Sequence, residues 1–138
     1  MLALLFTVGA QRCGVDARWV VEVVPAVPLE EALARYPNSC GGLVRRGACL
    51  PVYDLEQVFA GRPSSASLSR RIIIVPQSLG SGGAAAGLMA CGVTEATRVD
   101  ESTLLRQSFN ALRQDTPAGG LFYFDVNAAL AHCGYTAG

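Results

Sequence analysis

Short apolar runs separated by glycine, proline and polar residues dominate the chain. Leu2 to Val8 is one such run; a turn at residues 9–12 follows, and residues 13–17 fit its hairpin partner. Ile72 to Val75 is a β-branched run typical of a buried strand. The pattern predicts a mainly β fold built from many short strands.

Two strand-to-helix junctions resemble each other. Residues 50–59 and 121–130 each combine an apolar strand, an aromatic residue, an aspartate and a short amphipathic helix. Asp54 and Asp125 are the expected N-caps, and Gln57 adds a capping-box-like partner to Asp54. Two matching endings suggest a duplication and therefore two small barrels, although a chance match stays open.

The remaining segments give more local predictions. Residues 16–24 predict a helical turn capped by Asp16 that continues as a strand, and residues 29–36 predict a helix with Pro28 at its first position. Residues 78–87 are glycine-rich but lack the Gly-Lys-Ser/Thr ending of a phosphate-binding loop, which favours a plain flexible loop. Residues 88–99 predict two strands or one bent strand, and residues 100–112 a loop with some helix.

Composition narrows the class of protein. Hydrophobic residues make up 51% of the 138 and charged residues 16%, which excludes a disordered tail. The formal net charge is zero, so no overall field attracts nucleic acid or an anionic membrane. The apolar start, residues 1–8, lacks the basic region of a signal peptide and is too short to span a membrane. We therefore expect a soluble, cytoplasmic protein without membrane insertion.

Candidate catalytic chemistry is sparse. The five cysteines form no CxxC pair, and the single histidine, His132, neighbours Cys133 on a predicted helix, where adjacent side chains diverge. This predicts no catalytic site, no metal and no cofactor. Two alternatives stay open: a small redox protein or enzyme using Cys133 or Cys49, and a nucleic-acid-binding β-barrel.

The candidate functional residues lie on predicted surfaces. Arg45, Arg46 and Gly47 occupy a predicted hairpin tip, where arginine offers a planar fork of donors to a partner. Glu22 and Glu95 interrupt apolar runs, either as contact residues or as solvent-facing positions. Arg46 has a structural alternative, an ion pair with a carboxylate such as Asp54.

Taken in order along the chain, these motifs resemble the CheW-like family of bacterial chemosensory adaptors. The family's Asn-Leu-Arg-Gly turn and Pro-Val-x-Asp-Leu motif are similar to residues 44–47 and 51–55. Residues 4–16, 20–23, 87–95 and 121–130 resemble further family elements in the family's order. The run from Trp19 to Pro28 also resembles adaptors of Wsp-type surface-sensing pathways.

The resemblance implies two intertwined five-stranded SH3-like β-barrel subdomains with short helices, forming one domain over residues 1–138. It implies a non-enzymatic scaffold that bridges the cytoplasmic tip of a methyl-accepting chemoreceptor to the regulatory domain of a CheA-type histidine kinase. The partner-binding residues it indicates, with those from the surface analysis, are Glu22, Gly42, Arg45, Arg46, Gly47 and Glu95. Val44 and Arg45 replace the family's Asn and Leu, and Cys91 replaces an expected Asp, so partner choice is where we expect this chain to differ.

Overall fold

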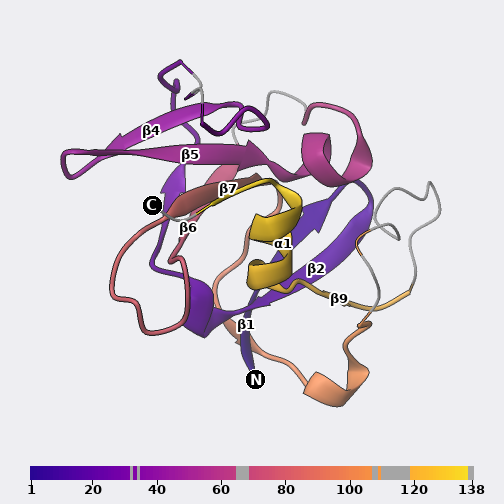
Figure 1. Ribbon diagram of the computed structural model, residues 1–138. Coiled ribbons are helices and arrows are strands. Elements are labelled where there is room, and N and C mark those ends of the chain that lie inside the picture. Colours follow the sequence, from indigo (N-terminus) through magenta and orange to yellow (C-terminus); the bar gives the residue numbers. More distant parts are fainter. Residues whose placement is uncertain (32, 34, 65–68, 107–108, 110–118, 137–138) are drawn as a thin grey trace.

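Two β-sheets organise the part of the chain that the computed structural model describes, which is residues 1–138 without 32, 34, 65–68, 107–108, 110–118 and 137–138 (Figure 1). The first sheet has the order β8-β1-β2-β9, from β1 (Leu2–Val8), β2 (Gln11–Asp16), β8 (Thr97–Arg98) and β9 (Phe122–Tyr123). The second has the order β3-β6-β7-β5-β4, from β3 (Glu22–Pro25), β4 (Gly41–Arg45), β5 (Ala48–Asp54), β6 (Arg71–Val75) and β7 (Ala86–Ala90). The expected mainly β, CheW-like architecture is confirmed. In the first sheet Leu105 adds a single parallel bridge to Phe122, beside four strands rather than five.

The two sheets are linked through β1. The Thr7 backbone N–H donates to the Cys91 carbonyl over 2.9 Å, at the point where the chain leaves β7. The Thr94 N–H then donates to the Leu5 carbonyl over 2.9 Å, and β8 pairs with the start of β1. The segment after β7 therefore carries the chain from the second sheet onto the edge of the first.

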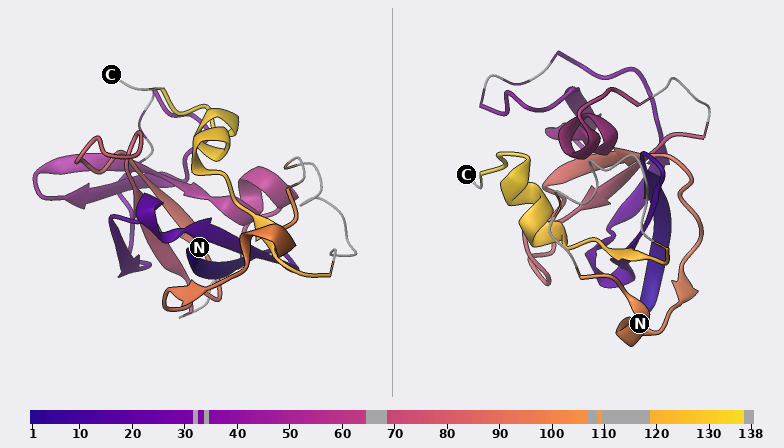
Figure 2. Two further views of the ribbon diagram at one scale, coloured as in Figure 1. Left: turned by 90° about the horizontal axis from the view of Figure 1, so that it is seen from below. Right: turned by 90° about the vertical axis from the view of Figure 1, so that its right-hand side faces the viewer.

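The central strands of the second sheet are buried on both faces. Along β6, Ile73 and Val75 pack in a core shared with β1, β2 and the C-terminal helix α1 (Val126–His132), while Ile72 and Ile74 pack in a second core. Side chains on a strand alternate between faces, so consecutive isoleucines supply both cores. Figure 2 shows α1 lying against the sheets, with the β4–β5 hairpin extending beyond the rest of the chain.

Both predicted strand-to-helix junctions form, and both use an aspartate. The Asp125 carboxylate accepts the Ala128 N–H over 3.2 Å at the start of α1, and the Asp54 carboxylate accepts the Glu56 N–H over 3.1 Å at a π-helix, η2 (Glu56–Ala60). The strands before them also pair alike, because β5 runs parallel to β7 and β9 parallel to β2. The two junctions thus share a parallel strand pairing and an aspartate that accepts a backbone N–H, but η2 is a π-helix and α1 an α-helix.

Short helical turns complete the described chain. Asp16 caps the 3-10 turn η1 (Ala17–Trp19) before β3, as predicted, and a further 3-10 turn, η3 (Glu101–Thr103), follows β8. In the segment 100–112, predicted as a loop with some helix, η3 supplies a helical turn, and residues 107–108 and 110–112 lie outside the described residues.

The predicted helix over residues 29–36 is wrong. The backbone of Glu30 instead exchanges two hydrogen bonds with Gly42 of β4, over 2.8 and 3.0 Å. An extended residue at position 30 is incompatible with a helix beginning at Pro28. Good helix formers are overruled here by pairing to a strand edge, a tertiary contact that local propensity does not contain.

Candidate protein-interaction surface

The turn between β4 and β5 consists of Arg46 and Gly47, with φ of 50° and 79°. Two left-handed residues define a type I′ turn, the connection that matches the twist of an antiparallel hairpin. Glycine adopts this conformation readily, whereas the Cβ of arginine makes it unfavourable. Arg46 is exposed at the tip of the hairpin. Its backbone has a conformation that glycine or asparagine would adopt more easily.

The two-residue turn decides which arginine points inward. Arg45 ends β4 on the same face as Leu43, two residues earlier, and Leu43 belongs to the second core. From there the Arg45 Nε donates to the Glu22 carboxylate over 2.8 Å, and Nη2 donates to the same oxygen. The Arg45 side chain is 16% exposed and that of Glu22 41%.

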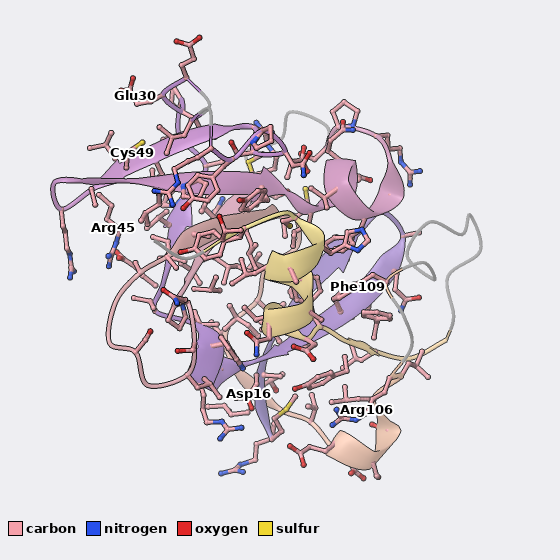
Figure 3. The ribbon with its side chains drawn as sticks, viewed as in Figure 1. Asp16, Glu30, Arg45, Cys49, Arg106 and Phe109 are labelled. Atoms are coloured by element: carbon pink, nitrogen blue, oxygen red, sulfur yellow. The ribbon has the colours of Figure 1, made fainter. Side chains whose placement is uncertain are left out.

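This ion pair joins the two edges of the second sheet. Glu22 lies on β3 and Arg45 on β4, at opposite ends of the strand order. The pair therefore lies where the sheet curls round to bring its edge strands together, and Figure 3 shows Arg45 near the outer end of the projecting hairpin. Of the predicted site residues, Glu22 and Arg45 are the two whose side chains the structure brings into contact.

A shallow groove lies between these edges, and we call it the β3–β4 seam. Its volume is about 190 Å³, smaller than a typical small-molecule pocket. It is lined by Glu22, Val24, Pro25, Val27, Leu43, Val44, Arg45 and Ile74. Val44 is 60% exposed and Val27 46%, and both line the groove. Exposed apolar side chains gathered around a groove are typical of a protein-interaction surface.

Gly42 has a structural role at one end of the seam. Its backbone bonds to Glu30, and a Cβ built on Gly42 would collide with the Cys49 sulfur. The residue is buried, so it supports the surface rather than contacting a partner. Sequence reasoning included Gly42 but missed Val24, Val27 and Leu43. The alternation of inward and outward positions along β3 and β4 is the signal that indicates Val24 and Leu43.

Glu95 lies elsewhere. It is exposed, and its neighbour Thr94 bonds to Leu5 of the first sheet. None of the contacts described for this part of the chain joins Glu95 to Glu22 or Arg45. The suggested pairing of Arg46 with Asp54 is also absent from the described contacts, where Asp54 accepts hydrogen bonds from Glu56, Gln57 and Ser64.

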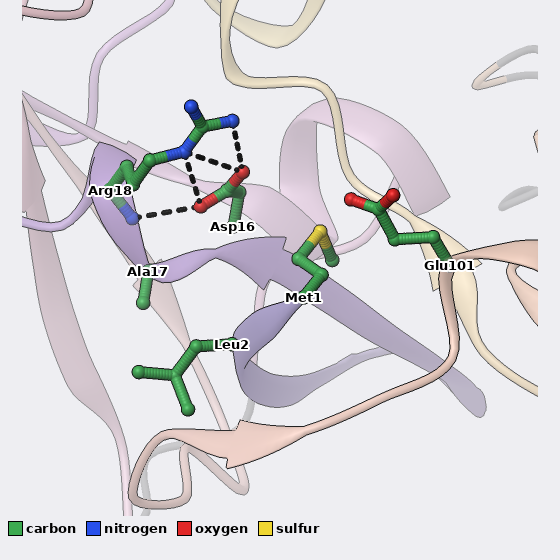
Figure 4. Close-up of a pocket in the computed structure, with 6 residues that line it drawn as sticks. All are labelled: Met1, Leu2, Asp16, Ala17, Arg18 and Glu101. Carbon is green, nitrogen blue, oxygen red and sulfur yellow. Dashed lines mark hydrogen bonds and ion pairs between the residues drawn. The ribbon is translucent and has the colours of Figure 1, made fainter.

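A second open pocket, of about 440 Å³, lies near the start of the chain (Figure 4). Arg18 donates its backbone N–H, Nε and Nη2 to the Asp16 carboxylate, at distances of 2.8 to 3.2 Å. The hydrogen bonds from the Arg18 side chain hold the pKa of Asp16 below its usual value. The Asp16 carboxylate therefore already accepts hydrogen bonds from Arg18, so neither side chain is free to bind a charged ligand without breaking this pair.

Four of the five cysteines are poorly suited to nucleophilic or redox chemistry, and the fifth, Cys49, is an exposed thiol. Burial raises the pKa of both Cys13 and Cys133 to about 12, and it also raises the pKa of Cys40 and Cys91. The reactive form of cysteine is the thiolate, so raised pKa values suppress it at neutral pH. All five cysteines are free thiols, and no cluster of metal-ligating side chains occurs within the described residues. The ring of His132 packs against the ring of Phe59, with 4.9 Å between the ring centroids.

Comparison with known proteins identifies the class to which this fold and surface belong. The CheW-like domain family matches residues 2–121, and the chain belongs to that family.

A similar solved structure is the scaffolding protein TtCheW from Thermoanaerobacter tengcongensis, with a TM-score of 0.61 and 29% sequence identity. The match covers 74% of this chain and 64% of TtCheW, so the chain corresponds to less than two thirds of that protein. No curated protein matches the chain. Within the described residues, no helix has the length and apolar character needed to cross a membrane.

Proposed function

We propose that the protein is a non-enzymatic adaptor that couples the cytoplasmic tip of a methyl-accepting chemoreceptor to the regulatory domain of a CheA-type histidine kinase. Family membership supports a role in chemosensory signalling, and the scaffolding role of TtCheW points the same way. In this proposal residues 1–138 form one domain of two barrel subdomains, in the cytoplasm, without a cofactor.

The observation that carries the proposal is the β3–β4 seam with the Arg46 tip beside it. Exposed valines provide apolar contact area, and Arg46 supplies an exposed cation at the end of a projecting hairpin. Interfaces commonly combine an apolar centre with arginine anchors. The raised pKa of Cys133 argues against that cysteine as the reactive thiol of the alternative, a cysteine-dependent redox protein.

Among the predicted site residues, we assign direct partner contact to Arg46 and supporting roles to four others. Glu22 and Arg45 hold the seam, Gly47 permits the turn, and Gly42 allows β4 to pack closely. Glu95 lies apart from the seam, and we propose it as a contact for a different partner surface.

Arg46→Asn is the variant that tests this assignment. Asparagine suits the first position of a type I′ turn, so stability should rise by about 0.5–1 kcal/mol as the strain at φ 50° is relieved. Removing a contact arginine should weaken binding of the cognate kinase's regulatory domain about five- to tenfold. Stability and affinity therefore move in opposite directions, which no purely structural role predicts.

The measurements are urea denaturation and isothermal titration with the purified regulatory domain. Arg98→Asn, an exposed arginine on β8 of the other sheet, is the matched control and should leave affinity unchanged. Unchanged affinity in Arg46→Asn would refute the contact role of Arg46. Failure of the unaltered protein to bind any kinase regulatory domain or receptor tip from its own organism would refute the adaptor function.

A further inference from the structure

The edge of β4 that faces the seam has unused backbone hydrogen-bonding groups. In a two-residue hairpin the residues flanking the turn, Arg45 and Ala48, bond to each other, so Arg45 and Leu43 direct their backbone groups toward β5. Gly42 and Val44 then direct theirs away from β5. Those of Gly42 bond to Glu30, whereas the described contacts contain no partner for those of Val44.

The segment around Glu30 pairs with this edge of β4 at a single position. Glu30 pairs antiparallel with Gly42, and in that register Pro28 would come opposite Val44. Proline has no N–H, so it cannot donate to the Val44 carbonyl. The pairing that starts between Glu30 and Gly42 therefore does not continue to Val44. The edge of β4 stays open from there to the hairpin tip.

The opposite side of the seam is also a free edge. The hydrogen bond from the Ala26 N–H to the Arg70 carbonyl sets the alternation along β3, so the backbone N–H and C=O groups of Val24 point toward β6, while the backbone groups of Val23 and Pro25 point away from it. Open edges attract additional strands unless they are covered or blunted. Pro25 blunts the β3 side, which leaves β4 as the better acceptor of a strand.

We propose that the β3–β4 seam binds an extended segment of a partner protein, which adds as a strand antiparallel to β4 and exchanges hydrogen bonds with Val44. The chain after β3, at residues 26–30, closes one end of the seam, so the segment enters from the side of Arg46. Its N-terminal end lies at the hairpin tip and its C-terminal end beside Val27. Addition of an extended peptide to a sheet edge is an established recognition mode.

Side-chain chemistry specifies the segment further. The residue that follows the one opposite Val44 comes opposite Leu43 and points into the groove, where Leu43, Val24 and Ile74 favour an aliphatic side chain. The residue two positions before the one opposite Val44 lies beside the exposed Arg46. Charge complementarity favours a carboxylate there. At the far end, exposed Glu30 and Glu31 favour a basic residue.

The occupant is therefore an extended, dipolar segment: acidic toward its N-terminus, aliphatic in the middle and basic toward its C-terminus. This inference refines the proposed adaptor function, on which the natural source of the segment rests. The strand addition itself is tested with synthetic peptides, so its failure is distinguishable from failure of kinase binding.

The probe is a soluble peptide of about seven residues with this pattern, alternating valine and threonine in its centre. A second peptide carries the two charges exchanged, and a third is N-methylated at the residue opposite Val44. Binding is followed by NMR titration, with amide hydrogen exchange at Val44 as the local readout. We expect saturable binding, slower exchange at Val44, weaker binding of the charge-exchanged peptide and at least about tenfold weaker binding of the N-methylated one.

Variants at Val44 complete the test. Val44→Pro removes the N–H without breaking a bond to β5 and should weaken the probe at least about tenfold, while Val44→Thr keeps the N–H and should bind as the unaltered protein does. The N-methylated peptide gives the same information if Val44→Pro does not fold. Equal binding of the probe and the N-methylated peptide, or no saturation by any peptide, would overturn the proposal. Slow exchange at Val44 that grows with protein concentration alone would also overturn it, because the occupant would then be a second copy of the chain.

Discussion

Replacing Arg45 with methionine tests whether its ion pair with Glu22 holds the edges of the second sheet together. Arg45→Met keeps the aliphatic stem and removes the charge, so the packing beside Leu43 changes little while Glu22 loses its donors. At a separation of about 4 Å and an effective dielectric constant of about 20, the attraction between unit charges is about 4 kcal/mol. Because the Arg45 side chain is only 16% exposed, desolvation offsets a large part of this energy.

The net coupling should lie between the values for exposed and buried pairs. Exposed pairs contribute about 0.2–1 kcal/mol, and removing one partner of a buried pair costs about 3–5 kcal/mol. For a half-exposed Glu22 with two charge-assisted hydrogen bonds, we expect a coupling energy of about 1–1.5 kcal/mol. A double-mutant cycle from Glu22→Gln, Arg45→Met and the double variant, measured by urea denaturation, isolates this term.

The Arg62–Glu56 pair is the matched control. Its nitrogen–oxygen distance is 3.5 Å and the Arg62 side chain is 55% exposed, so its coupling should stay below about 0.5 kcal/mol. A coupling at Arg45–Glu22 no larger than that of the control would refute the idea that this pair joins the sheet edges.

Three further predictions follow from the fold. Gly42→Ala should lower the free energy of unfolding by about 1–3 kcal/mol in urea denaturation, because its Cβ displaces the Cys49 sulfur; an unchanged midpoint would contradict the close packing there. Asp125→Ala should cost about 1 kcal/mol by removing the cap of α1, whereas Asp125→Ser should recover most of it. The folded pKa of about 12 at Cys13 and Cys133 exceeds the unfolded value near 9, so the stability that these two thiols contribute is constant below pH 8 and falls by about 2 kcal/mol between pH 9 and 10, as the unfolded thiols lose protons. Cys133→Ala should reduce the loss of stability between pH 9 and 10 by about 1 kcal/mol, and an unchanged loss would contradict the assignment.

Local signals in the sequence were sufficient for the regular elements. Continuous apolar and β-branched runs located β1 and β6. Asp125 located the start of α1 at residue 126, and Asp54 lies two residues before the start of η2. These features depend on neighbours within a few residues, which a sequence displays directly. The same analysis failed at Glu30, where the backbone pairs with Gly42 across a connection that propensity does not encode.

The functional surface was only partly predictable for the same reason. The hairpin tip at Arg46–Gly47 follows from the sequence, but the pairing of Glu22 with Arg45 depends on the strand order, which brings the first and last strands of a sheet together. Which arginine points inward depends on the turn length, since a two-residue turn leaves Arg45 on the strand. The open backbone of Val44 likewise follows from the register and the position of Pro28 rather than from residue type.

The central claim is that the seam and its arginine tip bind a protein partner in a chemosensory complex. The most direct test is titration of the cognate CheA-type regulatory domain into the unaltered protein, Arg46→Asn and Arg98→Asn. The proposal predicts saturable binding, a five- to tenfold loss in Arg46→Asn despite its equal or greater stability, and no loss in Arg98→Asn. Equal affinity for all three proteins, or no binding at all, would contradict it.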